Sequence, residues 1–257
     1  MLRARRAVLP ALASVLCVAL AFGRAPSVRA DPPAMHVLFV GNSYTRFHDL
    51  PRMVWRVAES TLGGPEVQVA SVTHPGWDLS RHWFERHASA RITGGGFTHV
   101  VLQGHSLTAL RSRDEFAGYA RLFADEITQA HGRAVLYETW ARRRGSIVYR
   151  DRLATDPRDM QERITRVYDD VAQAVGADVA PVGRAFLIAS ELAPRVALLG
   201  ADGAHPSVAG SYVAACTLLA SITREDPRAI TWRPHRMSRD DAATLREAAY
   251  RATAATH

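Results

Sequence analysis

Three side chains suited to nucleophilic catalysis stand in two short motifs at opposite ends of the sequence. Ser43 ends a Gly-Asn-Ser motif that directly follows an apolar run, and Asp202 and His205 belong to an Asp-Gly-Ala-His-Pro motif near the C-terminus. Attack on an ester requires a hydroxyl, an imidazole that takes its proton, and a carboxylate that orients the imidazole. Ser43, His205 and Asp202 could supply these groups, although each motif alone is also typical of an ordinary turn.

The sequence between these motifs alternates short apolar runs with longer stretches of helical period. The short runs predict strands at 36–40, 67–72, 99–102, 134–137 and 179–182. The longer stretches predict helices at 50–62, 79–90, 114–131, 157–175, 186–192 and 207–222, and a Ser238-x-x-Asp241 capping box predicts a last helix that ends near Thr253. Strands separated by helices indicate an α/β fold in which helices cover both faces of a parallel sheet.

Polar and small residues follow four of the predicted strands. Ser43 follows the first, Gly76 the second, Gln103 and His105 the third, and Glu138 and Trp140 the fourth. Ligands of open α/β sheets bind outside the carboxyl ends of the strands. We therefore expect one rim of the sheet to gather these groups, with Glu138 and Trp140 as candidate substrate-binding residues.

The N-terminus has the pattern of a secretory signal peptide. Three arginines precede an apolar stretch from Ala7 to about Phe22, and Val28-Arg29-Ala30 fits a small-x-small cleavage site. The apolar stretch is shorter than the roughly 20 residues of a membrane-spanning helix. We expect residues 1–30 to be the signal, export to the periplasm or beyond, and no stable membrane insertion after cleavage near Ala30.

Charge and composition narrow the chemistry further. The formal charge of +7 includes five arginines before Asp31, so positive and negative side chains nearly cancel in the remaining chain. This removes the main argument for nucleic-acid binding, which a concentration of positive charge would provide. The sequence contains no lysine, which excludes Schiff-base, Ser-Lys and P-loop mechanisms. Its histidines lack metal-binding spacing, and Cys216 is the only cysteine after the signal. We expect no metal and no cofactor.

The two outer motifs resemble those of the SGNH, or GDSL-like, hydrolase superfamily. The resemblance runs from about His36 to Ile222 and is closest to bacterial SGNH-like proteins with a Gly-Asn-Ser-Tyr/Phe-Thr start. It implies a flavodoxin-like three-layer α/β/α sandwich with a central, mainly parallel five-stranded sheet. It also implies that Ser43 is the nucleophile, His205 the base and Asp202 the orienting carboxylate. We expect a single domain over residues 31–257, with a helical extension over about 225–257.

The resemblance further implies an oxyanion hole made by the backbone N–H groups of Ser43 and Gly76. The family usually adds a side-chain Asn from a third motif after the third strand, which corresponds here to Gln103-Gly104-His105-Ser106, but Asn42 is the only Asn of this sequence. Gln103 and His105 are the candidates to replace it. We prefer Gln103, because an amide donates at every pH whereas a neutral His donates from a given nitrogen in only one tautomer.

These observations predict an exported serine esterase that removes a small acyl group, such as acetyl, from a carbohydrate or another polar substrate. Two alternatives stay open. The altered third motif favours a non-catalytic glycan-binding protein of the same fold, and an acyltransferase would use the same triad with a different acceptor. The expected partner is a small-molecule or glycan ester. The sequence leaves the acyl length and the oligomeric state open.

Overall fold

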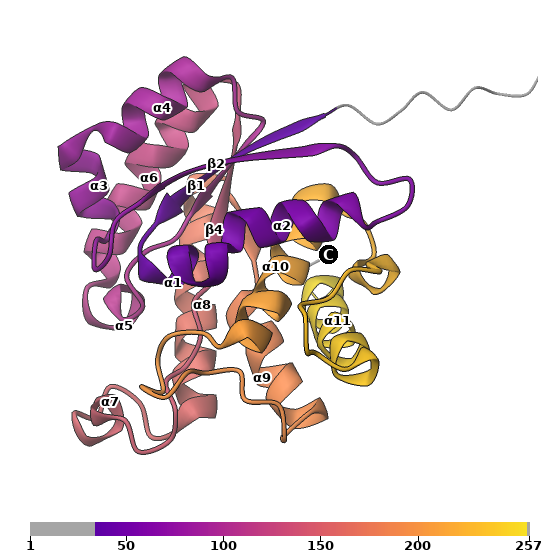
Figure 1. Ribbon diagram of the computed structural model, residues 1–257. Coiled ribbons are helices and arrows are strands. Elements are labelled where there is room, and N and C mark those ends of the chain that lie inside the picture. Colours follow the sequence, from indigo (N-terminus) through magenta and orange to yellow (C-terminus); the bar gives the residue numbers. More distant parts are fainter. Residues whose placement is uncertain (1–33, 256–257) are drawn as a thin grey trace, which may run out of the picture. The chain divides into compact units, whose positions relative to one another are not determined.

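A computed structural model describes residues 34–255 of the chain (Figure 1). The proposed signal peptide lies outside these residues. Five parallel strands form one sheet in the order β2-β1-β3-β4-β5. The strands are β1 (Met35–Gly41), β2 (Val67–Thr73), β3 (His99–Leu102), β4 (Arg133–Tyr137) and β5 (Asp178–Ala180).

Helices cover both faces of the sheet, because side chains of the inner strands alternate between two apolar clusters. In β1, Val37 and Phe39 enter one cluster, whereas Leu38 and Val40 enter the other. The first cluster also takes side chains from α2 (Leu50–Glu59), α9 (Val182–Leu192), α10 (Val208–Thr223) and α11 (Arg239–Ala254). The second takes them from α3 (Leu79–Glu85), α4 (His87–Gly95), α5 (Thr108–Arg111), α6 (Arg113–Gln129), α7 (Ile147–Arg150) and α8 (Pro157–Val175). The predicted three-layer α/β/α sandwich is therefore confirmed.

The strand order places a switch point beside β1. The chain moves from β1 to β2 on one side and then returns across β1 to β3 on the other. Short segments follow β1 at this point, namely α1 (Ser43–Arg46) and the 3₁₀ helix η1 (Phe47–Asp49). A crevice outside the carboxyl ends of the strands forms where the connections diverge. Ser43 begins α1 at this crevice.

Two predicted boundaries were wrong. The last strand ends at Ala180 rather than at residue 182, because Pro181 has no N–H group to donate to the sheet. The following helix, α9, already begins at Val182, since proline also suits the start of a helix. The predicted helix over 79–90 is two helices, α3 and α4. The break is at Arg86, whose φ of 57° is in the left-handed region.

The C-terminal residues pack into the same core as the preceding helices. The Ser238 hydroxyl accepts a hydrogen bond from the Asp241 N–H at 2.9 Å, so the predicted cap of α11 is present. Leu245 and Ala249 of α11 are fully buried against the cluster that contains α9 and α10. A second short helix, η2 (Pro227–Ala229), precedes α11. Among residues 34–255, no helix combines the length and apolar character needed to cross a bilayer.

Candidate active site

Ser43, His205 and Asp202 meet at the carboxyl edge of the sheet. The Ser43 Oγ lies 2.9 Å from His205 Nε2, and His205 Nδ1 lies 2.5 Å from Asp202 Oδ2. Ser43 is the first residue of α1, so its side chain stands at the end of β1 and not within the sheet. The three groups therefore form a continuous relay of hydroxyl, imidazole and carboxylate.

Asp202 is fixed by its own loop. Its Oδ1 accepts hydrogen bonds from the backbone N–H groups of Ala204 and His205, each at 3.0 Å, while Oδ2 remains for the imidazole. The hydrogen bond from His205, followed by those from the backbone, lowers the pKa of Asp202 to about 2. The carboxylate is therefore charged at every pH at which an imidazole can act as a base.

The loop that carries His205 is held at its base and at its side. Leu199 and Pro206 form an antiparallel bridge, and the Gly200 N–H donates to the His205 carbonyl at 2.8 Å. From the segment after β4, the Arg143 guanidinium donates to the carbonyls of Gly200 and Ala201 at 2.5 and 3.2 Å. These contacts limit the freedom of the imidazole relative to the sheet.

Aromatic rings enclose the imidazole. The Phe47 ring stacks on His205 with the ring centres 4.4 Å apart, and Tyr44 approaches His205 edge-on at 5.4 Å. Tyr44 in turn stacks on Trp140 at 4.5 Å, and Trp140 stacks on Phe186 at 4.2 Å. The rings therefore restrict rotation of His205 about its side-chain bonds.

Asn42 shapes the turn that presents Ser43. It is the N-cap of α1, and its side-chain oxygen accepts from the Tyr44 N–H at 3.1 Å. Its Nδ2 donates to the Trp77 carbonyl at 2.9 Å, which ties the nucleophile turn to the turn after β2. Gly76, at the centre of that second turn, has a φ of 76°. The Asn42 side chain thus joins the turn at Ser43 to the turn at Gly76.

A cavity of about 340 Å³ opens in front of Ser43. Its lining comes from five segments and consists of Asn42, Ser43, Tyr44, Pro75, Gly76, His105, Ser106, Arg142 and His205. Among the described residues, the N–H groups of Ser43 and Gly76 have no hydrogen-bond acceptor. Two backbone donors and the Ser43 hydroxyl thus border the same space, which is the arrangement that an oxyanion hole requires.

We compared the sequence and the structure with known proteins. No protein-family profile and no curated protein matches the sequence. Among solved structures, a DUF4886 family protein from Bacteroides uniformis has a TM-score of 0.73 at 16% identity, over 86% of this chain and 95% of that one. A candidate SGNH hydrolase from Slackia heliotrinireducens has a TM-score of 0.61 at 26% identity, over 74% of this chain and 99% of that one.

The chain has the fold of the SGNH hydrolases. Axe2, an acetylxylan esterase from Geobacillus stearothermophilus, shares this fold with a TM-score of 0.57 at 18% identity, over 77% of this chain and 97% of that one. The predicted resemblance is thereby confirmed for the fold.

The structure does not place Gln103, the side chain preferred as the oxyanion donor, at the cavity. Gln103 is fully buried and does not line the cavity. Its Oε1 accepts from the Asn42 N–H at 2.9 Å and from the Thr45 hydroxyl at 3.0 Å, and its Nε2 donates to the Gly104 carbonyl. Gln103 is a positioning residue that holds the nucleophile turn against β3.

The close approach of Gln103 also explains the glycine of the first motif. A Cβ at Gly41 would lie 2.5 Å from the Thr45 Oγ1 and 2.7 Å from the Gln103 Oε1. Beneath the turn, the buried His82 lies with its Nε2 2.9 Å from the Gly41 carbonyl. The Gly41 backbone is therefore enclosed on both sides, and no side chain fits there without moving the turn.

His105 lies where the side-chain donor was expected. It lines the cavity, and its Nδ1 accepts from the Leu107 N–H at 3.4 Å. Burial, followed by the positive charge of Arg142, lowers the pKa of His105. The ring is therefore neutral near pH 7, and with Nδ1 as acceptor the proton is on Nε2. Gln103 and His105 were both candidates, and only His105 reaches the cavity.

The predicted substrate contact of Glu138 was also wrong. Its side chain is completely buried behind the cavity, where Oε1 accepts from Gln161, Thr165 and the Arg184 N–H at 2.8, 3.1 and 2.9 Å. Its Oε2 accepts from the Arg184 Nε at 3.2 Å. Burial raises the pKa of Glu138 to about 7, against the opposing charge of Arg184. Glu138 is a structural anchor between β4, α8 and α9.

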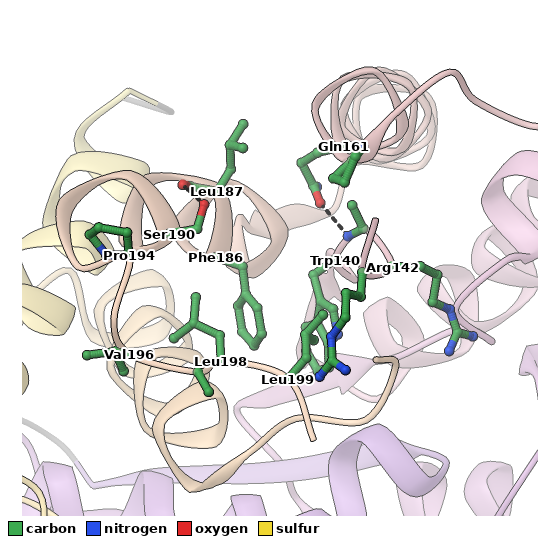
Figure 2. A pocket seen from close by; sticks show the side chains of 14 residues that line it. Trp140, Arg142, Gln161, Phe186, Leu187, Ser190, Pro194, Val196, Leu198 and Leu199 are labelled. Atoms are coloured by element: carbon green, nitrogen blue, oxygen red, sulfur yellow. Dashed lines mark hydrogen bonds between the residues drawn. The ribbon is translucent and has the colours of Figure 1, made fainter. Parts of the chain in front are cut away.

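Trp140 lines an apolar pocket and not the cavity in front of Ser43. It lines an apolar pocket of about 350 Å³ beside the catalytic cavity, together with Phe186 and Leu198 (Figure 2). Gln161, at the rim of this pocket, accepts from the Ala141 N–H at 2.9 Å. Trp140 itself is almost fully buried, so it separates the apolar pocket from the ring packing around His205.

Sequence reasoning assigned no role to two polar residues that line the cavity in front of Ser43, Arg142 and Ser106. The Arg142 guanidinium donates to the Ser106 hydroxyl at 2.5 Å and lies 5.7 Å from the centre of the Tyr44 ring. A run of three arginines from 142 to 144 was visible in the sequence, but nothing in it distinguished the inward-facing Arg142 from a solvated neighbour. Residues 34–255 contain no cluster of His, Cys, Asp or Glu suited to a metal ion.

Proposed function

We propose that the protein is a serine esterase that hydrolyses a small acyl ester of a carbohydrate or another polar molecule. The observation that carries this proposal is the relay from Ser43 through His205 to Asp202, with contacts of 2.9 and 2.5 Å, at the wall of an open cavity. Similar solved structures include an acetylxylan esterase and a lipase/acylhydrolase, which supports ester hydrolysis as the reaction.

In the proposed reaction, the Ser43 Oγ attacks the ester carbonyl carbon while His205 Nε2 takes the hydroxyl proton. The tetrahedral intermediate collapses, the alcohol leaves with that proton, and an acyl-Ser43 ester remains. Water then attacks the acyl group with His205 again as the base, which releases the acid and restores Ser43. Asp202 keeps Nδ1 protonated throughout and stabilises the imidazolium that forms in each half-reaction.

The negative charge on the carbonyl oxygen would be held by three donors. They are the N–H groups of Ser43 and Gly76 and the Nε2–H of His105. The helix dipole of α1, a single turn, contributes little beyond its first N–H group. A neutral His105 with a fixed tautomer donates across the alkaline range in which His205 is an unprotonated base.

The cavity favours a short acyl group and a polar leaving group. Arg142, Ser106 and His105 contribute polar atoms to a space of about 340 Å³. This supports acetyl or a similarly short acyl group on a hydroxyl-rich substrate.

The test is hydrolysis of p-nitrophenyl acetate by residues 31–257 and by the Ser43→Ala variant. We expect kcat of the variant to fall by roughly 10³-fold or more, because the nucleophile is lost. Ser60→Ala is the matched control, since the Ser60 hydroxyl only bonds the Val57 carbonyl at the end of α2. Full labelling of Ser43→Ala by a fluorophosphonate would overturn the assignment of the nucleophile.

We also propose that the reaction takes place outside the cytoplasm. The arginine-rich start, the apolar run and the Val28-Arg29-Ala30 site support cleavage before Asp31. N-terminal sequencing of the protein recovered from a secreting host should therefore begin at Asp31. An intact Met1 terminus in the membrane fraction would show that the segment remains as an anchor.

A further inference from the structure

A second hollow, of about 700 Å³, lies between the start of α2 and the segment that joins η2 to α11. It is lined by His48, Asp49, Arg52, Met53, Arg56, Trp232, Arg233, Pro234, His235 and Arg236. The four arginines and two histidines face a single carboxylate, that of Asp49. In a protein whose residues after the signal are nearly neutral, this hollow is a local concentration of positive charge.

Within residues 34–255, carboxylates form no ion pair with the arginines of this hollow, whereas they pair with several other surface arginines. Elsewhere in the described chain, Arg228 pairs with Asp226 at 2.6 Å and Arg113 pairs with Asp170 at 2.8 Å. Within residues 34–255, no ion pair involves Arg52, Arg56 or Arg236. Their exposed guanidinium groups keep their fork-shaped donor sets open to an oxyanion.

The wall of the hollow is connected to the catalytic histidine. Phe47 stacks on His205, and the next residue, His48, begins the lining of the hollow. His48 and Asp49 have φ values of 54° and 50°, a left-handed conformation that non-glycine residues rarely adopt. A contact of 2.9 Å between His48 Nδ1 and the Ser211 Oγ holds this segment against α10. The hollow is thus a fixed neighbour of the active site.

An aromatic ring forms part of the same wall. Trp232 is half-buried, its carbonyl accepts from the Tyr212 hydroxyl at 2.9 Å, and the Arg56 guanidinium lies 5.7 Å from the centre of its ring. An indole beside arginines offers an apolar face to a sugar ring and charged donors to the groups that the sugar carries.

We propose that this hollow binds an anionic saccharide, with uronate or sulfate groups held by Arg52, Arg56, Arg233 and Arg236. Because Phe47 connects the hollow to His205, the bound saccharide would be part of the same chain that presents its ester to Ser43. In this respect the inference rests on the proposed function and narrows its substrate class to anionic glycans.

Binding is measured with Ser43→Ala, so that no turnover is needed. The probes are a tetragalacturonate, a heparin tetrasaccharide and a neutral xylotetraose, each titrated by calorimetry at low and at physiological salt. We expect at least one anionic probe to bind more than tenfold tighter than xylotetraose, and its binding to weaken as salt rises. Binding of tetragalacturonate would show that carboxylates suffice. Binding of the heparin tetrasaccharide alone would show that sulfate groups are required, because heparin carries uronates as well.

Arg56→Gln with Arg236→Gln, added to Ser43→Ala, should weaken binding of the anionic probe about tenfold or more. The matched control is Arg121→Gln with Arg166→Gln, which removes the same charge from exposed sites on α6 and α8. Circular dichroism verifies that each variant is folded. An equal loss in the control, or equal affinity for neutral and anionic probes, would overturn the proposal.

Two further outcomes separate this inference from its alternatives. Binding to phosphatidylglycerol vesicles that is lost in the Arg56/Arg236 variant, with no binding of either anionic tetrasaccharide, would contradict a glycan site and indicate a membrane surface instead. Hydrolysis of p-nitrophenyl acetate tests the esterase separately. An active esterase whose hollow binds no anion would leave the proposed function standing and remove only this inference.

Discussion

The indole Nε1 of Trp140 donates a hydrogen bond to the Ala204 carbonyl at 2.9 Å, directly before His205. Trp140 follows β4, so this bond connects the sheet to the loop that carries the base. Trp140 is also clamped between the rings of Tyr44 and Phe186. The position of the imidazole is therefore set by the core of the protein as well as by its own loop.

Gly203→Ala should reduce activity more than it reduces stability. Gly203 has a φ of 68°, and an added Cβ would lie 2.8 Å from the Arg143 Cβ. The loop must therefore shift beside His205, and we expect kcat for p-nitrophenyl acetate to fall by about tenfold or more, since small displacements of catalytic groups are costly.

The matched control for Gly203 is Gly145→Ala. Gly145 has a φ of 86°, and an added Cβ would meet no atom within 4 Å. Both substitutions carry the same backbone cost, of order 1 kcal/mol in unfolding free energy, but only Gly203→Ala meets Arg143. Equal kcat values for the two variants would show that the loop tolerates the displacement.

Asp202→Asn should lower kcat by roughly 10²- to 10⁴-fold while the loop stays in place. The Asn carbonyl oxygen keeps the role of Oδ1 as acceptor from Ala204 and His205, but its amide group faces Nδ1 as a donor. The imidazole then adopts the wrong tautomer for deprotonating Ser43. Asp125→Asn, on the exposed side of α6, is the control. A near-normal rate would mean that another group orients His205.

His105→Ala should mainly lower kcat, whereas Gln103→Ala should mainly lower stability. Loss of a donor to the oxyanion predicts a fall of about 10²- to 10³-fold in kcat for His105→Ala, with little change in thermal stability. Gln103→Ala leaves the buried Asn42 N–H and Thr45 hydroxyl without their acceptor, so it should lower the unfolding free energy by about 1–3 kcal/mol. Partial recovery of kcat in His105→Asn would identify the lost function as hydrogen-bond donation.

The pH dependence of stability should change in Glu138→Gln. In the folded protein the pKa of Glu138 is about 7, above its ordinary value of 4.5. As pH rises from 4.5 to 7, the unfolded chain loses this proton first, so the unfolding free energy contributed by Glu138 falls, by up to about 3 kcal/mol. Urea unfolding at several pH values should show this decline in the wild type and a flatter profile in Glu138→Gln. Parallel profiles would contradict the raised pKa.

The fold could be predicted because its pattern is local. The alternating direction of side chains along β1 decides which of its apolar residues enters which cluster, and the helical period of α8 is visible in the sequence. The break between α3 and α4 could not be predicted. It depends on a left-handed backbone at Arg86, a residue type that rarely adopts that conformation.

The candidate site was predictable in residue type but not in orientation. Ser43, Asp202 and His205 follow from the chemistry that they share, and the structure brings the three together. The roles of Gln103 and Glu138 depend on partners far away in the sequence, such as Asn42 at a separation of 61 and Arg184 at 46. Their side chains turn away from the cavity to satisfy these buried groups, and no local pattern carries that information.

The contact between Ser43 and His205 joins residues 162 positions apart. The Asp202–His205 pair and the Asn42 turn are each local and can form before the rest of the domain is assembled. Only the docking of α10 and the loop before it against the sheet brings nucleophile and base together. If the proposed reaction runs through this relay, turnover reports complete assembly, and a state that retains the sheet with α10 detached is expected to be inactive.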